Sequence, residues 1–142
     1  MARAAADGAG EAALLVPACD ATPEVLLGAS AYLFVCPENL GSLSGAMKEM
    51  FDLAYYPLLG QVEGRPYATA IAAGSAGQGA ESQIDRIATG WRLQRIAPGM
   101  IVNLQAQTNA AILAPKRLNP RQLADCHDLG RAFAEGIAMG IY

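Results

Sequence analysis

The chain has 142 residues, of which 53% are hydrophobic and 16% are charged, and its formal net charge is −3 at pH 7. These values predict one folded domain, residues 1–142, with a sizeable core, and they exclude a disordered chain. The slightly acidic balance argues against a nucleic-acid or anionic-membrane partner, and no apolar run approaches the roughly 18 residues of a membrane span.

In chain order, strand-like and helix-like segments alternate. Continuous apolar runs, which suit strands covered on both faces of a parallel sheet, occur at ALLVPA (13–18), AYLFVC (31–36), PYATAIAA (66–73) and MIVNLQA (100–106). Segments with helical periodicity lie at 23–29, 43–58, 80–91 and 123–137. The alternation predicts an α/β fold with a parallel sheet between two layers of helices.

The helical segments also predict which side chains are buried. The apolar stripe of the first long helix comprises Leu43, Met47, Met50, Phe51, Ala54 and Leu58, and that of the last helix comprises Leu123, Cys126, Gly130, Phe133 and Ile137. Trp91 falls on the stripe of 80–91, so we expect its ring in the core rather than stacked on a ligand. Asn119 is the predicted N-cap of the last helix, with Pro120 as its first residue. Residues 105–119 form the longest irregular segment.

Cysteine use and the N-terminus bear on the compartment. Cys19, Cys36 and Cys126 lie far apart and show no metal-ligand spacing. We interpret them as buried free thiols in a reducing environment. The N-terminal stretch MARAAADGAGE lacks the apolar core of a secretory signal. We therefore expect a cytoplasmic protein without a metal site.

Ligands of α/β sheets bind beyond the carboxyl ends of the strands, which points to the loops Pro37–Ser44 and Gly74–Gly79. The first loop offers backbone N–H groups, two hydroxyls and a carboxylate–amide pair, and it leads into a helix N-terminus. Such a rim suits the edge of a flat heteroaromatic ring better than a phosphate. The Glu38 carboxylate can either contact the ligand or fix the loop by accepting a backbone N–H.

The glycine loop allows other interpretations. AGSAG (73–77) is a variant of the nucleophile elbow around Ser75, but the one histidine, His127, falls inside the last helix, where a solvated or packed side chain is expected. GQGAES is one residue short of a dinucleotide fingerprint, and no suitable acid follows the next strand. A flexible turn that lets the backbone approach a neighbour accounts for the glycines equally well.

The run YLFVCPENLGSLSGAMKEMFD (32–52) resembles a signature of the flavodoxin-like NAD(P)H-dependent FMN reductases, T-P-E-Y-x-G-S-x-P-G-x-L-K-N-x-x-D. The matching residues, in order, are Pro37, Glu38, Gly41, Ser42, Gly45, Lys48 and Asp52. Asn39 and Leu40 stand where an aromatic and a variable residue are usual, and Ser44 replaces the proline. The later run GRPYATAIAAGSAGQGAESQIDRI (64–87) is similar to the fourth strand and following loop of the family, so the resemblance extends over about residues 1–142.

This resemblance implies a flavodoxin-like, doubly wound parallel sheet in a three-layer α/β/α arrangement. It implies that backbone groups of two loops hold the isoalloxazine ring of FMN, at Pro37, Glu38, Asn39, Leu40, Gly41, Ser42, Ser44, Gly74 and Ser75. It further implies NAD(P)H as the hydride donor, an acceptor of unknown identity, no particular side chain as acid or base, and a homo-oligomer.

The same resemblance implies a first strand and a phosphate loop ahead of the first helix, whereas MARAAADGAGEAALL (1–15) looks like the tail of that helix leading into strand two. A central first strand would bury four to six large apolar side chains at about 1.5–3 kcal/mol each, comparable with the net stability of a domain. Three hypotheses follow: strand 13–18 lies beside strand 31–36, a partner chain fills the place, or the gene product starts upstream of Met1.

Two functions are compatible with these observations. The first is an oxidoreductase that uses FMN to pass hydride or electrons from NAD(P)H to an acceptor. The alternative is a non-catalytic flavodoxin-like remnant that acts as an oligomeric binding module without flavin. A visible absorption spectrum of the purified chain separates the two.

Overall fold

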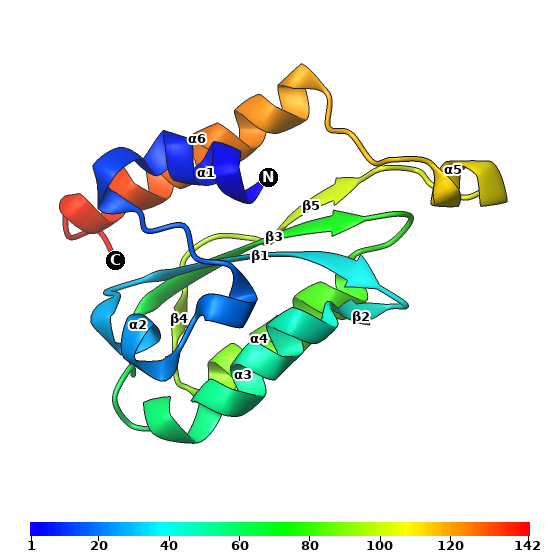
Figure 1. The fold of residues 1–142 in the computed structure, drawn as a ribbon. Coiled ribbons are helices and arrows are strands. Elements are labelled where there is room, and N and C mark those ends of the chain that lie inside the picture. The colour runs from blue at the N-terminus through cyan, green and yellow to red at the C-terminus, as the bar shows by residue number, and fades with distance from the viewer.

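Helices and strands alternate along residues 1–142, all of which the computed structural model describes (Figure 1). The helices are α1 (Ala2–Ala9), α2 (Pro23–Gly28), α3 (Gly45–Leu58), α4 (Gln78–Gly90), α5 (Asn109–Leu113) and α6 (Pro120–Ala138). The strands are β1 (Tyr32–Asn39), β2 (Ser42–Leu43), β3 (Pro66–Ala73), β4 (Gln94–Arg95) and β5 (Met100–Asn103). None of these helices combines the length and the apolar character that a membrane span requires.

The sheet is centred on β3, which is almost entirely buried. β1 pairs with one edge of β3 in parallel, from Tyr32↔Tyr67 to Pro37↔Ala72. β4 and β5 pair in parallel with successive parts of its other edge. Only the two-residue β2 is antiparallel, paired to the end of β1. The expected parallel sheet is therefore confirmed, with one short antiparallel addition.

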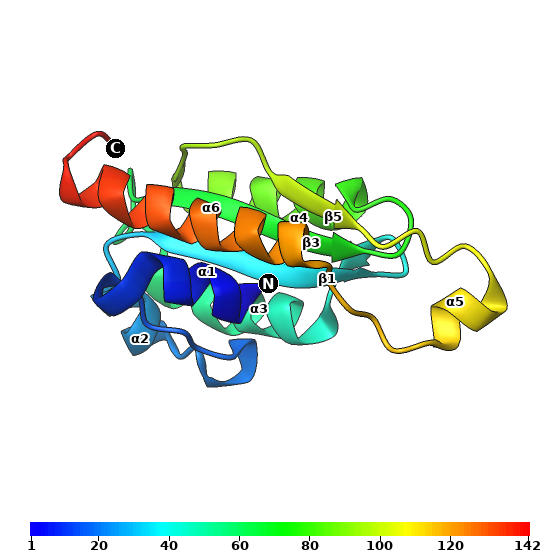
Figure 2. The same cartoon turned by 90° about the horizontal axis from the view of Figure 1, so that it is seen from above.

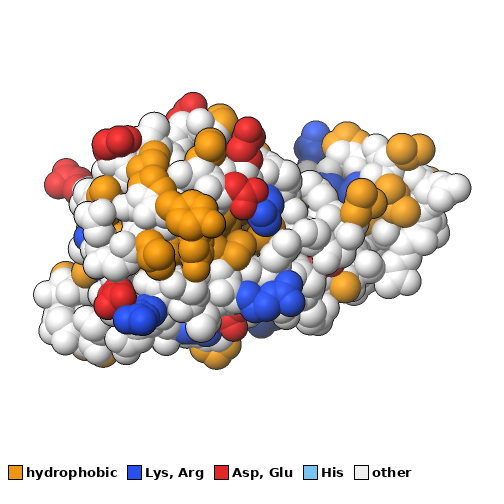
Figure 3. All heavy atoms as spheres, turned by 90° about the horizontal axis from the view of Figure 1, so that it is seen from below, with side chains coloured by type: hydrophobic (Ala, Val, Ile, Leu, Met, Phe, Trp, Pro, Cys, Tyr) orange, Lys and Arg blue, Asp and Glu red, His pale blue; other side chains and the backbone are white.

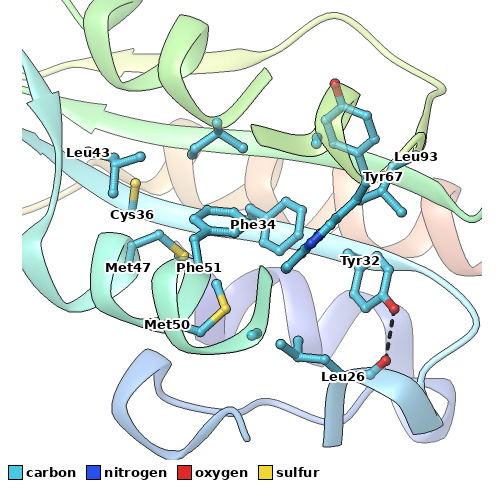
Figure 4. Packing of buried hydrophobic residues seen from close by; sticks show 14 of the residues in the cluster. Leu26, Tyr32, Phe34, Cys36, Leu43, Met47, Met50, Phe51, Tyr67 and Leu93 are labelled. Carbon is cyan, nitrogen blue, oxygen red and sulfur yellow. Dashed lines mark hydrogen bonds between the residues drawn. The ribbon is translucent and has the colours of Figure 1, made fainter. Parts of the chain in front are cut away.

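Helices cover both faces of the sheet, which confirms the predicted three-layer arrangement. α1 and α6 lie side by side on one face, whereas α3 and α4 lie on the other (Figures 1 and 2). The main core of 18 buried residues packs between the sheet and the α3–α4 layer (Figure 4). Its aromatic centre joins Phe34 of β1 to Phe51 of α3, and Phe51 to Trp91.

Most predicted burial is confirmed. All members of the 43–58 stripe are buried, and Trp91 is fully buried. Asn119 caps α6 through a capping box with Gln122, and Pro120 is its first residue. Two expectations are wrong. Leu123 is 42% exposed, because it lies at the start of α6. Cys19 is exposed, although Cys36 and Cys126 are buried free thiols as expected.

The predicted strand at 13–18 is also wrong. Residues 13–17 belong to no strand, and a short 3-10 turn, Ala18–Asp20, follows them. They do not pair with β1, which also removes the hypothesis that this segment lies directly beside it. A cavity of about 1070 Å³, which we call the β1 edge cavity, is lined by both residues 13–17 and β1. Without a hydrogen-bonding neighbour, an apolar run has no ladder to join.

Candidate functional site

The carboxyl ends of β1, β3 and β5 meet at one edge of the sheet. Pro37 of β1 is opposite Ala72 of β3, and Ala73 of β3 is opposite Asn103 of β5. The loops that follow these strands are therefore neighbours, although they lie far apart in the sequence. This edge is the candidate functional site.

The first loop is a tight β-hairpin rather than an open connection. β1 continues to Asn39, which pairs with Ser42, so that only Leu40 and Gly41 form the turn. Both have left-handed backbone conformations, with φ of 53° and 75°, as a two-residue type I′ turn requires. Leu40 is a poor residue for such a conformation, and its side chain is fully exposed at the tip.

Glu38 joins the hairpin to the glycine loop. Its Oε1 accepts a hydrogen bond from the Gly77 N–H at 2.8 Å, and its Oε2 accepts one from the Ala80 N–H at 3.1 Å. The carboxylate thus occupies the N-terminus of α4, where unpaired N–H groups and the helix dipole favour negative charge. Of the two roles expected for Glu38, the structure shows the second, in which the carboxylate fixes the loop.

The hairpin and the glycine loop are also in direct contact. A Cβ atom on Gly79 would lie 2.0 Å from the Gly41 carbonyl oxygen, so the hairpin turn packs directly on the first turn of α4. Burial acts to raise the pKa of Glu38, but hydrogen bonds from the N–H groups of Ala80, Gly77 and Gly79 outweigh it and lower that pKa. Glu38 is therefore charged at neutral pH, and it is this charged form that links the two loops.

The predicted serine ligands are engaged within the chain. The Ser42 hydroxyl donates to Gln83 Oε1 at 2.5 Å, and the Leu43 N–H donates to the same oxygen at 3.1 Å. Ser44 is the N-cap of α3 and accepts from the Met47 N–H at 3.4 Å. These hydroxyls position the hairpin between α3 and α4, so any contact with a ligand would come in addition to these bonds.

A third loop, which the sequence analysis did not include, adjoins Gly74 and Ser75. Asn103 Nδ2 donates to the Ser75 carbonyl at 2.5 Å, and the Ala106 N–H donates to the Gly74 carbonyl at 2.7 Å. Asn103 Oδ1 accepts from the Gln105 N–H at 2.8 Å. The rule that selected the other two loops also applies to Asn103, which is the last residue of β5. No sequence signal marked Gln83.

Free backbone donors remain at the tips of the first two loops. The N–H groups of Leu40 and Gly41 in the hairpin, and of Ser75 and Ala76 in the glycine loop, donate to no acceptor within the chain. All four residues lie at the surface. Neutral N–H donors of this kind fit the carbonyl oxygens and ring nitrogens of a flat heteroaromatic ring. An anion is less suited to α4, because Glu38 already occupies its N-terminus.

The other residues singled out in the sequence lie outside the site. Trp91 is buried, and its Nε1–H donates to the Tyr55 carbonyl at 3.1 Å. His127 is a half-exposed residue of α6 beside Asp128. No cluster of three or more His, Cys, Asp or Glu side chains is arranged to hold a metal ion.

Solved structures show the same fold. A flavodoxin from the domain Archaea superposes with a TM-score of 0.70 at 15% identity, over 96% of this chain and 87% of the flavodoxin. A flavodoxin, WrbA-like protein from Agrobacterium tumefaciens gives 0.61 at 14% identity, with coverage of 94% and 87%. An NADPH-quinone reductase from P. pentosaceus gives 0.52 at 15% identity, with coverage of 79% and 71%. The flavodoxin-like fold is thereby established.

The sequence itself matches a family profile. No curated protein is similar enough in sequence to be matched. The profile described as NADPH-dependent FMN reductase matches residues 16–108, which include the hairpin and the glycine loop and make up more than half of the chain. The chain therefore belongs to the NADPH-dependent FMN reductase family.

Proposed function

We propose that the protein is an oxidoreductase that binds FMN at the hairpin and glycine loops and passes hydride or electrons from NAD(P)H to an acceptor. The observation that carries this proposal is the pair of loops joined by Glu38, whose tips present free backbone N–H groups. Membership of the FMN reductase family supports it.

The residues of the chain have distinct roles in this proposal. Glu38 keeps the two loops in a fixed relation, so that their donors need no reorganisation when a ring binds. The N–H groups of Leu40, Gly41, Ser75 and Ala76 would donate to the edge of the ring, and Pro37 and Asn39 would border it. Bound FMN supplies the hydride-accepting chemistry, and the protein supplies orientation and hydrogen bonds.

Titration with lumiflavin, the ring without its ribityl phosphate, tests the ring site by itself. We expect saturable quenching of flavin fluorescence and, with FMN, a yellow protein that is bleached by NADH or NADPH. Glu38→Gln should weaken lumiflavin binding about tenfold, because the loops lose their link. Glu49→Gln is the matched control, since Glu49 is exposed on α3. A colourless protein that binds neither FMN nor lumiflavin contradicts the proposal.

The β1 edge cavity favours a second candidate function, namely an oligomeric binding module without flavin. Its volume of about 1070 Å³ extends along β1 from Tyr32 to Pro37, and it offers a binding space that needs no redox ring. The same titrations decide between the candidates, because a binding module would leave both flavins free.

We also propose that the protein is cytoplasmic and forms a homo-oligomer. Its three cysteines are free, as expected in a reducing compartment. A hydrophobic patch lies on the α3–α4 face (Figure 3), and three large apolar side chains of that region, Leu53, Tyr56 and Leu59, are 50–80% exposed. Exposed apolar surface of this kind marks interaction sites. Nucleic acid and membrane are not among the proposed partners, given the net charge of −3.

A further inference from the structure

One edge of β1 has no strand partner. Over Tyr32–Pro37, β1 is hydrogen-bonded to β3 on one side only. On the opposite edge, pairing is limited to Glu38 and Asn39, which face the short β2. An unpaired edge in the middle of a fold is unusual, because buried backbone N–H and C=O groups need partners.

This bare edge opens into the β1 edge cavity, whose walls are apolar. Hydrophobic residues make up 26 of the 33 that line it. Ala5, Phe133 and Ile137 line it from the α1–α6 layer, whereas Leu26, Met47 and Met50 line it from the α2–α3 layer. Residues 13–17 also line it, and there Leu14 and Leu15 remain 79% and 47% exposed.

These walls define the chemistry of an occupant. It must be apolar toward both helix layers, and it must offer hydrogen-bond donors and acceptors in the plane of the sheet. A lipid tail or a flat aromatic ligand meets only the first condition. An extended polypeptide segment with a continuous apolar sequence meets both, as strands buried on both faces do.

A second copy of this chain has no spare strand to offer. Every other apolar run is already in the sheet, and residues 13–17 are themselves part of the cavity lining. The helix before them is tightly docked: a Cβ atom on Gly130 of α6 would lie 1.9 Å from the Ala5 carbonyl oxygen, and one on Gly8 would lie 2.0 Å from the His127 carbonyl oxygen. Releasing residues 13–17 would break this packing.

We propose that the β1 edge cavity is a strand acceptor, which takes one extended apolar polypeptide segment from outside residues 1–142. The segment pairs with β1 along Tyr32–Pro37, a length of about six residues or ~20 Å. It runs parallel to β1, as in the rest of the main sheet. α1, which lines the cavity on one side, runs in the opposite direction to β1 (Figures 1 and 2).

The first test uses synthetic peptides without flavin, so its outcome does not depend on the proposed oxidoreductase function. The probe KKVIVIVVKK carries a run of about six apolar residues that matches the free edge of β1. KKVIPIPVKK keeps the apolar character but loses two backbone donors, and KKVSVSVSKK is apolar on one face only. We expect saturable binding of the probe alone, with a rise in thermal midpoint of about 5–10 °C at saturation and slower amide exchange in β1.

The second test changes the cavity wall. Ala134 of α6 lines the cavity, and Ala132 of the same helix is exposed outside it. Ala134→Arg should weaken probe binding at least about tenfold, whereas Ala132→Arg should leave it unchanged. If Ala134→Arg does not fold, the probe joined ahead of Met1 by a short Gly-Ser linker gives a second measurement. This tethered strand should protect the same β1 amides at low protein concentration.

Each other outcome overturns the proposal. Equal binding of KKVIPIPVKK would show an apolar ligand site rather than strand pairing. Protection of β1 that appears with rising protein concentration, without peptide, would assign the cavity to a second copy. Absence of β1 protection with both the free and the tethered probe would show that the edge accepts no strand.

Discussion

Glu38 shows how one side chain defines the candidate site. It lies 39 residues before Gly77, yet its carboxylate accepts hydrogen bonds from the N–H groups of Gly77 and Ala80. The hairpin and the glycine loop are therefore positioned by one charged group at a helix N-terminus. Both carboxylate oxygens of Glu38 are engaged by these N–H groups, so we do not assign Glu38 as an acid or base in the candidate ring site. In the proposed function its contribution is positional, and its contribution to stability depends on pH.

Glu38→Gln should lower the free energy of unfolding at pH 7 by about 0.5–1.5 kcal/mol, because the amide replaces one acceptor oxygen by a donor and the site is partly solvated. The folded-state pKa of Glu38 is lowered, so its stabilisation is present above the unfolded pKa of about 4.3 and is lost as pH falls through the folded pKa. Urea unfolding at pH 7 and pH 3 measures this. An equal difference from wild type at both values would contradict the prediction.

Leu40 has an unfavourable backbone conformation, which should lower the stability of the fold. It adopts φ of 53°, and its fully exposed side chain gains no packing in return. Leu40→Gly should therefore stabilise the fold by about 0.5–1 kcal/mol, because glycine adopts the left-handed region without steric strain. Leu59→Gly, at a residue with φ of −59°, should not stabilise it. Thermal unfolding of both variants checks this, and a destabilised Leu40→Gly would show that the leucine makes contacts in a larger assembly.

At the scale of elements, polar side chains attach α4 to the sheet on the side away from the hairpin. Arg95 of β4 forms ion pairs with Glu81 and Asp85 of α4, both at 2.8 Å. Its guanidinium lies over the ring of Tyr67, 4.9 Å from the centroid. The Tyr67 hydroxyl donates to Asp85. α4 is thus held at its N-terminus by Glu38 and along its length by Arg95 and Tyr67.

This attachment predicts an alkaline transition. Burial, followed by the hydrogen bond to Asp85, raises the pKa of Tyr67 to about 12. A raised pKa means that the stabilisation is complete below the unfolded value of about 10 and is lost as pH rises to about 12. Between pH 9 and pH 12 the free energy of unfolding of wild type should fall by about 1–2 kcal/mol more than that of Tyr67→Phe. The control variant Tyr56→Phe should show the same pH dependence as wild type. Parallel curves for wild type and Tyr67→Phe would contradict this assignment.

At the scale of the whole molecule, the two faces of the sheet are unequally packed. The 18-residue core lies on the α3–α4 side and holds all the large buried aromatic side chains. On the α1–α6 side the buried residues are few and mostly small, such as Ala5 and Cys126. The β1 edge cavity accounts for this difference, because Phe133 and Ile137 of α6 border the cavity instead of a packed strand.

The exposed apolar side chains of α3 lead to a prediction about assembly. We expect the protein to elute as a homo-oligomer in size-exclusion chromatography with light scattering. Tyr56→Glu should shift it toward the monomer, because a charge in an interface carries a desolvation penalty. Glu49→Gln, also on α3, should not. If wild type is monomeric at micromolar concentration, the prediction that the α3–α4 face forms the oligomer interface is wrong.

The sequence by itself determined the alternation of buried strands and amphipathic helices, because continuous apolar runs and helical periodicity are local properties of the chain. It also identified the hairpin and glycine loops through the position of each loop after a strand. The lumiflavin and FMN titrations, with the Glu38→Gln variant, test whether these two loops bind the ring.

Only the tertiary structure decided that Glu38 caps α4, that Gln83 engages Ser42, and that Asn103 adjoins Ser75, because each bond joins residues 28 to 42 positions apart. The tertiary structure also decided that residues 13–17 form no strand. Their apolar sequence is typical of a strand, but a strand forms only where a neighbouring edge lies within hydrogen-bonding distance, and the β1 edge cavity keeps that edge out of reach.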